Sequence, residues 1–251
     1  MNDDAAPSLK TFNARLPFPH NPPFPAVFAE RVPLLYALRL AILQFETRTN
    51  AYPSSFREFI SKRCGLELEK PFVLAECGVY RGSSLLASGR LLTELGVRAE
   101  LFGLDTFLGL PKMSEMDRKY LSEKAPYEDK LFFSDTSMAE VMTALLDAKL
   151  WGEIQLIPGL FKETLPKLRD KMYDFVNIDC DLYEPHIQCL EYFYPRMHRG
   201  GTIFFDDYYS ASYPMARAAI DFFMKGKPET LMHLRYGEDA INHTKVFFVK
   251  L

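Results

Sequence analysis

Apolar and polar residues are arranged in two different patterns along this chain. From about residue 70 onward, short apolar runs are separated by longer segments in which apolar residues recur every three or four positions. The short runs predict buried β-strands, and the longer segments predict amphipathic helices. The predicted strands are 71–76, 100–105, 153–159, 174–179 and 201–207, and the predicted helices are 83–95, 137–149, a helix around 163–170, 184–194 and 214–224.

The order of these elements predicts the fold class. Strands that alternate with helices form βαβ units, which gives an α/β fold with a doubly wound, mostly parallel sheet. The segment from Leu231 to the end predicts two strands joined by a turn at Gly237. Because that connection is short, the last strand must run antiparallel to its predecessor. The polar, charged stretch 111–133 between the second strand and the next helix predicts a loop or lid.

The first 69 residues follow a different pattern, and they predict an N-terminal arm and helical cap in front of a main domain over 70–251. Five prolines in LPFPHNPPFP exclude a regular helix or a central strand there. Residues 26–48 predict an amphipathic helix with a kink near Pro33. We expect this region to cover the ligand crevice or to form a subunit contact, and hence a homo-oligomer of two or more copies.

Composition narrows the possible partners. The chain has 251 residues, 48% hydrophobic and 25% charged, with a net charge of -3 and no long basic run. This balance argues against nucleic acid or an anionic membrane as the main partner. No run of 18 apolar residues occurs, so no membrane span is expected. Four cysteines without paired spacing and an acidic, polar N-terminus predict a reduced, cytoplasmic protein.

Acidic residues follow the predicted strands. In open α/β sheets, ligands bind outside the carboxyl ends of the strands, near the point where the strand order reverses. A single Asp in such a place is often only a turn former or a helix cap. Several carboxylates around one crevice repel one another, so they need a cation or a hydrogen-bonding ligand between them. The residues concerned are Glu76, Asp105, Asp179, Asp206 and Asp207.

The loop after the first strand predicts a binding site for S-adenosylmethionine (SAM). Its spacing is E-x-G-x-x-x-G, which is neither the dinucleotide G-x-G-x-x-G pattern nor a phosphate loop. SAM suits it, because its ammonium group needs an acidic partner and its carboxylate suits the N–H groups at a helix start. Asp105 would accept hydrogen bonds from the ribose hydroxyls. The other candidate residues of this loop are Glu76, Gly78, Tyr80, Gly82 and Ser83.

A second group of carboxylates predicts a metal site. Asp179, Asp206 and Asp207 end two neighbouring strands with no Cys/His cluster nearby, and this oxygen-rich set favours Mg²⁺ over Zn²⁺. A bound cation could lower the pKa of a substrate hydroxyl. Asp181, two residues past Asp179, could accept the proton as a general base. Equally, Asp181 could cap the helix that begins near Glu184.

Other polar residues carry less chemistry. His186 and His198 are expected to be surface or core residues, while His243 in the last hairpin could face the acceptor. Cys180 between two aspartates predicts a small packed residue, because acidic neighbours raise the pKa of a thiol.

Five ordered motifs resemble the macrocin O-methyltransferase family. They are AECGVYRGSS, FGLDTFLGLP, PGLFKETLP, NIDCDLYEP and the Tyr-Pro…Gly-Gly…Phe-Asp-Asp-Tyr run, and together they cover roughly residues 70–225. Members of this family use SAM and Mg²⁺ to methylate sugar hydroxyls of natural products. The resemblance implies the class I SAM-dependent methyltransferase fold, a seven-stranded sheet whose last strand is antiparallel. It also implies the metal and base roles given above, with Ser134 near the adenosine.

Two segments depart from the family pattern, and both are expected to line the acceptor side. After Asp-Asp-Tyr the chain reads SASYPMARAAIDFF, where Arg217 corresponds loosely, and the last strand is NHTKVFFVK in place of an aromatic strand. The favoured acceptor is a sugar hydroxyl of a small secondary metabolite. A phenolic, catechol-type acceptor and a non-catalytic SAM-binding protein remain alternatives, whereas the missing G-x-G-x-x-G disfavours an NAD-dependent oxidoreductase.

Overall fold

The computed structural model describes residues 34, 37, 38, 41, 71–94, 97–121, 132–148, 153–235 and 244–251. Their centre is a seven-stranded sheet with the strand order β3-β2-β1-β4-β5-β7-β6. The strands are β1 Phe72–Cys77, β2 Ala99–Asp105, β3 Glu153–Pro158, β4 Tyr173–Ile178, β5 Met197–Phe205, β6 Met232–Arg235 and β7 Thr244–Val249. The helices are α4 Ser83–Glu94, α5 Glu115–Tyr120, α6 Met138–Asp147, α7 Phe161–Thr164, α8 Tyr183–Phe193 and α9 Pro214–Met224, with 3₁₀ turns at Leu165–Lys167 and Tyr194–Arg196.

The predicted doubly wound sheet is confirmed. β1 to β5 run parallel to one another, and β7 runs antiparallel to both β5 and β6. The chain builds outward from β1 through β2 to β3, then returns to the other side of β1 with β4 and β5. The order therefore reverses between β1 and β4, and ligands of such sheets bind at the carboxyl ends of the strands beside this reversal.

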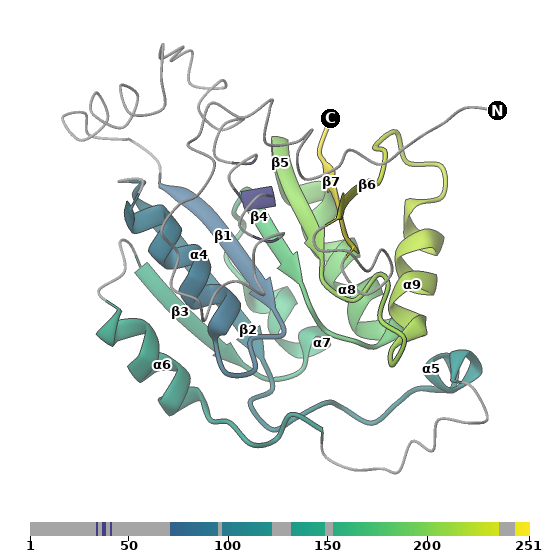
Figure 1. The fold of residues 1–251 in the computed structure, drawn as a ribbon, viewed down its shortest axis with the longest axis horizontal. Helices are drawn as coiled ribbons and strands as arrows, with labels where there is room; N and C mark the ends of the chain where they lie inside the picture. The colour runs from purple at the N-terminus through teal and green to yellow at the C-terminus, as the bar shows by residue number, and fades with distance from the viewer. Residues whose placement is uncertain are drawn as a thin grey trace.

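Helices cover both faces of the sheet (Figure 1). On one face, Leu85 and Leu91 of α4 and Val141 of α6 pack on β1 and β2. On the other face, Leu190 of α8 and Ile220 of α9 belong to a second apolar cluster with side chains of β1, β2, β4 and β5. The strands are apolar on both faces because a parallel sheet between two helical layers has no solvent-facing side. This is why the predicted strands appeared as continuous apolar runs.

Three predicted elements differ from the structure. The stretch predicted as a loop or lid, 111–133, contains the short helix α5, whose start is fixed by a capping box between Ser114 and Asp117. The helix predicted around 163–170 is a four-residue α7 followed by a 3₁₀ turn, because Pro166 has no N–H to donate to a preceding carbonyl. β5 begins at Met197 and ends at Phe205, so Asp206 and Asp207 lie just beyond it rather than within it.

Little of the predicted N-terminal cap lies within the described residues. Leu34, Ala37, Leu38 and Ala41 are helical and buried, and they belong to the same apolar cluster as Phe72 of β1. Their spacing is that of one face of a helix, as the amphipathic pattern predicts. The remaining residues of 1–69 and the turn at Gly237 lie outside the described residues. The cap, the subunit contact and the domain boundary near residue 69 stay predictions.

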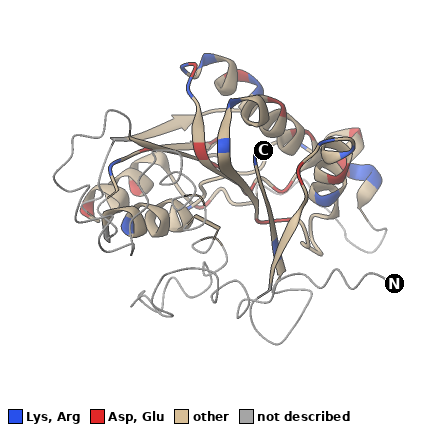
Figure 2. Ribbon diagram, turned by 90° about the horizontal axis from the view of Figure 1, so that it is seen from above, with Lys and Arg blue, Asp and Glu red and all other residues tan. Residues whose placement is uncertain are grey.

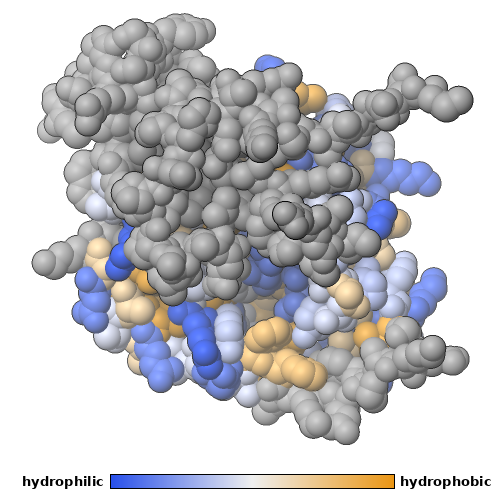
Figure 3. Space-filling model, viewed as in Figure 1, coloured by the Kyte–Doolittle hydropathy of each residue, from blue (hydrophilic) through white to orange (hydrophobic). Residues whose placement is uncertain are grey.

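The described surface is mixed in character. Lys and Arg are spread over helices on both sides of the sheet (Figure 2), and apolar and polar side chains are interspersed on the described part of the face in Figure 3. None of the described helices combines the length and apolar character that crossing a membrane requires.

Candidate active site

A cavity of about 650 Å³ opens at the carboxyl ends of β1, β2, β4 and β5. Its size is typical of a site for a small molecule or cofactor. The structure brings most of the sequence-predicted site residues together around it. They are Gly78, Tyr80, Ser83, Asp105, Asp179, Asp181, Asp206 and Asp207. Glu76, Gly82 and Ser134 are not among the residues that line it.

The β1–α4 loop is held against the loop after β4. Gly78 has a φ of +92°, and a Cβ there would lie 1.7 Å from the carbonyl oxygen of Asp179. Gly82 has a φ of +80°, and its Cβ would lie 2.8 Å from Cγ1 of Val141 in α6. Both positions therefore exclude a side chain because another part of the chain approaches. Gly78 also lines the cavity, whereas Gly82 does not.

Asp105 organises the same loop. Its Oδ2 accepts hydrogen bonds from the backbone N–H groups of Val79 at 2.7 Å and Tyr80 at 2.8 Å. Its Oδ1 accepts one from the N–H of Phe107 at 2.8 Å. The carboxylate thus fixes the first turn after β1 while it also lines the cavity. Its predicted contact with a ribose stays a prediction.

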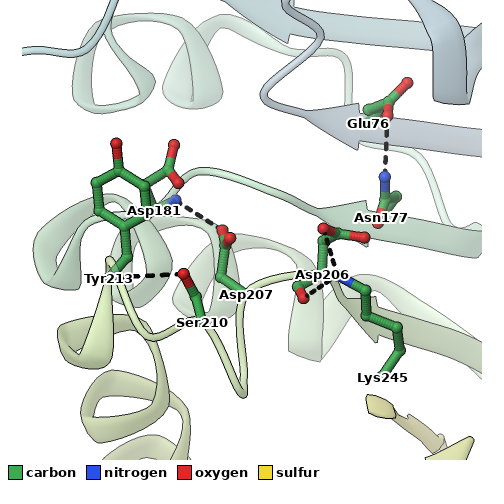
Figure 4. Close-up of polar contacts among 8 residues, drawn as sticks. All are labelled: Glu76, Asn177, Asp181, Asp206, Asp207, Ser210, Tyr213 and Lys245. Atoms are coloured by element: carbon green, nitrogen blue, oxygen red, sulfur yellow. Dashed lines mark hydrogen bonds and ion pairs between the residues drawn. The ribbon is translucent and has the colours of Figure 1, made fainter. Parts of the chain in front are cut away.

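Glu76 and Ser134 lie near the cavity but do not line it. Glu76 is buried, and its Oε1 accepts a hydrogen bond from Nδ2 of Asn177 on neighbouring β4 at 2.9 Å (Figure 4). Ser134 is exposed, while its neighbour Phe133 lines the cavity. The ring of Phe133 meets the ring of Tyr80 edge to face at 5.2 Å. The cavity wall next to Ser134 is therefore aromatic, and the predicted place of Ser134 near the adenosine stays a prediction.

The predicted metal ligands converge. One carboxylate oxygen from each of Asp179, Asp206 and Asp207 lies within 4.8 Å of the other two. Asp207 is buried, and the other two are partly buried. Three hard oxygen donors at one point, contributed by the ends of two adjacent parallel strands, fit a Mg²⁺ ion.

Electrostatics at this point also favour a cation. Burial, followed by the neighbouring charge of Asp206, raises the pKa of Asp207 to about 7. Burial and the charges of Asp207 and Asp206 raise the pKa of Asp181 well above its ordinary range. Carboxyl groups packed this closely resist ionisation, and a bound positive charge would relieve that cost.

Asp181 occupies the centre of the site but does not cap the helix that follows. Its backbone N–H donates to Oδ2 of Asp207 at 2.9 Å, with a left-handed φ of +59° (Figure 4). The N-cap of α8 is Leu182, and no side chain caps it. The helix-cap interpretation of Asp181 is therefore wrong, because the chain turns at Asp181 before the helix starts. Its side chain remains available to the cavity.

The first N–H of α8 is satisfied from another element. Oδ1 of Asp117 in α5 accepts it from Tyr183 at 2.6 Å, while Oδ2 accepts from the N–H of Ser114 at 2.8 Å. Asp117 is buried and lines the cavity. The stacked rings of Tyr120 and Tyr183, 6.0 Å apart, add to the same contact. Sequence analysis missed this wall, although the Ser-x-x-Asp of its capping box was a signal for it.

Lys245 is a second residue that sequence analysis missed. Its Nζ donates to Oδ2 of Asp206 and to the Asp206 carbonyl oxygen, both at 2.7 Å (Figure 4). Burial lowers the pKa of this amine, but the charge and hydrogen bond of Asp206, together with the charges of Asp179 and Asp207, outweigh burial and raise it. No motif near Lys245 pointed to this role, because the contact comes from pairing β7 with β5.

His186 and His198 lie outside the cavity lining, while Cys180 is part of it. His186 is buried outside the cavity lining, and burial lowers its pKa to about 4, so its ring is neutral. Cys180 is buried, as expected of a small packed residue, and burial raises the pKa of its thiol to about 12, which disfavours the reactive thiolate. His198 lies in β5 away from the cavity lining, and His243 lies outside the described residues.

Another part of the cavity wall, between α8 and the start of α9, carries several polar side chains. It is lined by Glu184, Gln188, Ser210, Ser212 and Tyr213. The loop between β5 and α9 is held by Ser210, whose hydroxyl accepts from the N–H of Tyr213 at 3.2 Å (Figure 4). Hydroxyl, amide and carboxylate groups beside an aromatic ring suit a ligand with many hydroxyl groups.

Comparison with known proteins identifies related sequences. The family model described as Macrocin-O-methyltransferase (TylF) matches residues 68–237. Mycinamicin III 3''-O-methyltransferase of Micromonospora griseorubida is 28% identical over 145 residues, which are 55% of this chain and 56% of that protein. Demethyldecarbamoylnovobiocin O-methyltransferase of Streptomyces niveus is 29% identical, over 60% of this chain and 57% of that protein. The chain thus spans about half the length of the curated relatives it matches.

Solved structures share the fold. The O-methyltransferase NovP superimposes with a TM-score of 0.59 at 25% identity, over 78% of this chain and 77% of that one. The calicheamicin methyltransferase CalS11 superimposes with a TM-score of 0.56 at 20% identity, over 91% and 87%. The methyltransferase sheet expected from the sequence is therefore confirmed.

Proposed function

The chain belongs to the macrocin-O-methyltransferase family, and from this premise we propose that it transfers a methyl group from SAM to a hydroxyl of a small glycosylated metabolite, with Mg²⁺ as the metal. The observation that carries the proposal is the shared cavity. The cavity is lined by the β1–α4 loop and Asp105, and also by Asp179, Asp206 and Asp207. A methyl donor and an acceptor hydroxyl would meet there.

We assign the donor to the β1 and β2 side. Ser83 opens α4 at the cavity, where the N–H groups of a helix start suit the carboxylate of SAM. Gly78, Tyr80 and Asp105 would contact the rest of the molecule. Three other predicted residues do not line the cavity and would instead shape the loops that bind SAM: Glu76, Gly82 and Ser134.

We assign the acceptor to the β4 and β5 side. Asp179, Asp206 and Asp207 would hold Mg²⁺, which supplies a positive charge that makes the acceptor hydroxyl more acidic. Asp181 would take the hydroxyl proton as the O–C bond forms and the C–S bond of the donor breaks. Its buried setting, which raises its pKa, suits a group that must hold a proton. The protein's main contribution is alignment of the methyl group with the acceptor oxygen.

The relatives favour a sugar as the acceptor. By name, one acts on mycinamicin III at a 3'' position, and another on a rhamnosyl tetracenomycin at a 4' position, the latter from Streptomyces olivaceus at 29% identity over 55% of this chain and 53% of that protein. The polar wall of Glu184, Gln188, Ser210 and Ser212 supports the same class, because each can exchange hydrogen bonds with sugar hydroxyls.

The proposal is tested by separating binding from turnover. SAM affinity is measured by calorimetry, and methyl transfer is measured on a panel of glycosylated macrolides, aminocoumarins and catechols, with EDTA or with Mg²⁺. We expect turnover on glycosides only, abolished by EDTA and by Asp206→Ala but not by the control Asp170→Ala, whose side chain is exposed and outside the cavity. Full activity in EDTA would remove the metal role, and SAM binding without turnover on any acceptor would remove catalysis.

A further inference from the structure

Lys245 places a fixed positive charge directly against the candidate metal ligands. Its Nζ contacts both the carboxylate and the carbonyl oxygen of Asp206 at 2.7 Å. The side chain is only 20% exposed, and that of Asp206 is 21% exposed, so solvent screens the pair weakly. Lys112 and Lys162 also line the cavity.

The position of Lys245 follows from the antiparallel pairing of β7 with β5. The register joins Phe205 to Val246 and Phe204 to Phe247. Phe204 and Phe247 belong to the apolar cluster on one face of the sheet. Because side chains alternate along a strand, Asp206 and Lys245 continue that same face one step beyond the last pair. The contact is therefore built into the backbone pairing and does not depend on a flexible surface loop.

This charge must influence any divalent ion bound by the triad. One oxygen of Asp206 already accepts a hydrogen bond from the ammonium, so an incoming cation shares that carboxylate. For an ion held by the same carboxylate, repulsion by one unit charge lowers affinity by about tenfold even at the dielectric constant of water. In return, Lys245 keeps Asp206 oriented and partly neutralised when no cation is bound.

We propose that Lys245 is the built-in counter-ion of this site: it positions Asp206 and weakens divalent-cation binding, so that the acidic site stays assembled without metal and releases the metal readily. The inference rests on the proposed metal role of Asp179, Asp206 and Asp207. It concerns a strand in which the sequence departs from the family pattern, so it is a property of this chain's own residues. Lys245 is a positioning residue, since it acts through Asp206.

The test measures Mn²⁺ affinity by calorimetry in the full-length protein without SAM or acceptor. We expect Lys245→Met to bind Mn²⁺ at least fivefold more tightly than the wild type, and Lys245→Arg to stay within threefold of it. Lys171→Met is the matched control, because Lys171 forms a similarly buried ion pair with Glu100 near the amino ends of the strands, away from the cavity. Its Mn²⁺ affinity should match the wild type. Should Lys245→Met fail to fold, Lys245→Gln carries the same measurement.

A second readout uses thermal unfolding. In EDTA, Lys245→Met should melt at a lower temperature than the wild type, and Mg²⁺ should raise its Tm by more than it raises that of the wild type. Equal Mn²⁺ affinity in the wild type and Lys245→Met, or weaker binding in the variant, would overturn the counter-ion inference while leaving the metal site intact. Absence of Mn²⁺ binding in every protein would instead overturn the metal site itself, and the inference with it.

Discussion

Replacing Gly78 with alanine tests how tightly the two halves of the site are joined. The added methyl group would lie 1.7 Å from the carbonyl oxygen of Asp179 and 2.7 Å from the carbonyl carbon. These atoms belong to the backbone and cannot rotate away, so the β1–α4 loop must separate from the β4–α8 loop. The left-handed φ of +92° adds a second cost, because a Cβ disfavours that conformation.

The magnitude follows from these two effects. A left-handed conformation costs an alanine roughly 1–2 kcal/mol, and an extra methyl group in a packed position costs roughly 1–3 kcal/mol. Gly78→Ala should therefore lower the free energy of unfolding by roughly 2–5 kcal/mol. Gly226 separates the two effects, since its φ is +79° and nothing lies within 4 Å of a Cβ there. Gly226→Ala should cost only roughly 1–2 kcal/mol.

The assay is urea unfolding of both variants followed by circular dichroism, with Mn²⁺ affinity measured in parallel. Because the clash displaces the residue that supplies one metal ligand, Gly78→Ala should also weaken Mn²⁺ binding about tenfold or more. Gly226→Ala should leave Mn²⁺ binding unchanged. Equal destabilisation by the two substitutions would refute the close approach of the two loops as the reason for glycine at position 78.

Three further predictions address the base, the buried histidine and the α5 wall. Asp181→Asn should lower kcat about 10²–10⁴-fold with SAM affinity unchanged; a loss below tenfold in steady-state kinetics would exclude Asp181 as the base. Burial lowers the pKa of His186 to about 4, below the usual value of about 6.5, so its stability contribution is complete above pH 6.5 and is lost as the pH falls towards 4. Between those pH values the free energy of unfolding, measured in urea, should fall by about 3 kcal/mol more for the wild type than for His186→Asn. Parallel plots of that free energy against pH for the two proteins would contradict this. Asp117→Asn turns one buried acceptor into a donor that faces either the N–H of Ser114 or the N–H of Tyr183, so unfolding should become easier by about 2 kcal/mol. Ser114→Ala, which removes only the cap hydroxyl, should cost about half as much, and equal costs would show that the bond to Tyr183 contributes little.

The sequence predicted the parallel strands well because their chemistry is local. β1 to β4 are mostly apolar runs, and each begins and ends within two residues of its prediction. The acidic residues after them were also visible, since a residue that follows a strand in a doubly wound sheet must lie at the ligand edge. Asp179, Asp206 and Asp207 therefore converge as expected.

The sequence was less informative where a residue's partner is distant along the chain. The requirement for glycine at position 78 comes from the backbone of Asp179, 101 residues later, and no local pattern indicates that contact. The sequence allowed Asp181 to be a helix cap, whereas in the structure the chain turns at Asp181 before α8 begins. Asp117 looked like part of a polar loop, although it satisfies the first N–H of α8, 66 residues away.

The sequence by itself determined the order of strands and helices and the acidic character of the strand ends. These features depend on the spacing of apolar and polar residues over a few positions. What only the tertiary structure decided is which of those groups touch one another. Lys245 is the clearest case: its partner Asp206 lies 39 residues earlier, and only the antiparallel pairing of β7 with β5 brings the two charges together. Charge–charge contact depends on distance in space, and that distance is set by the sheet as a whole.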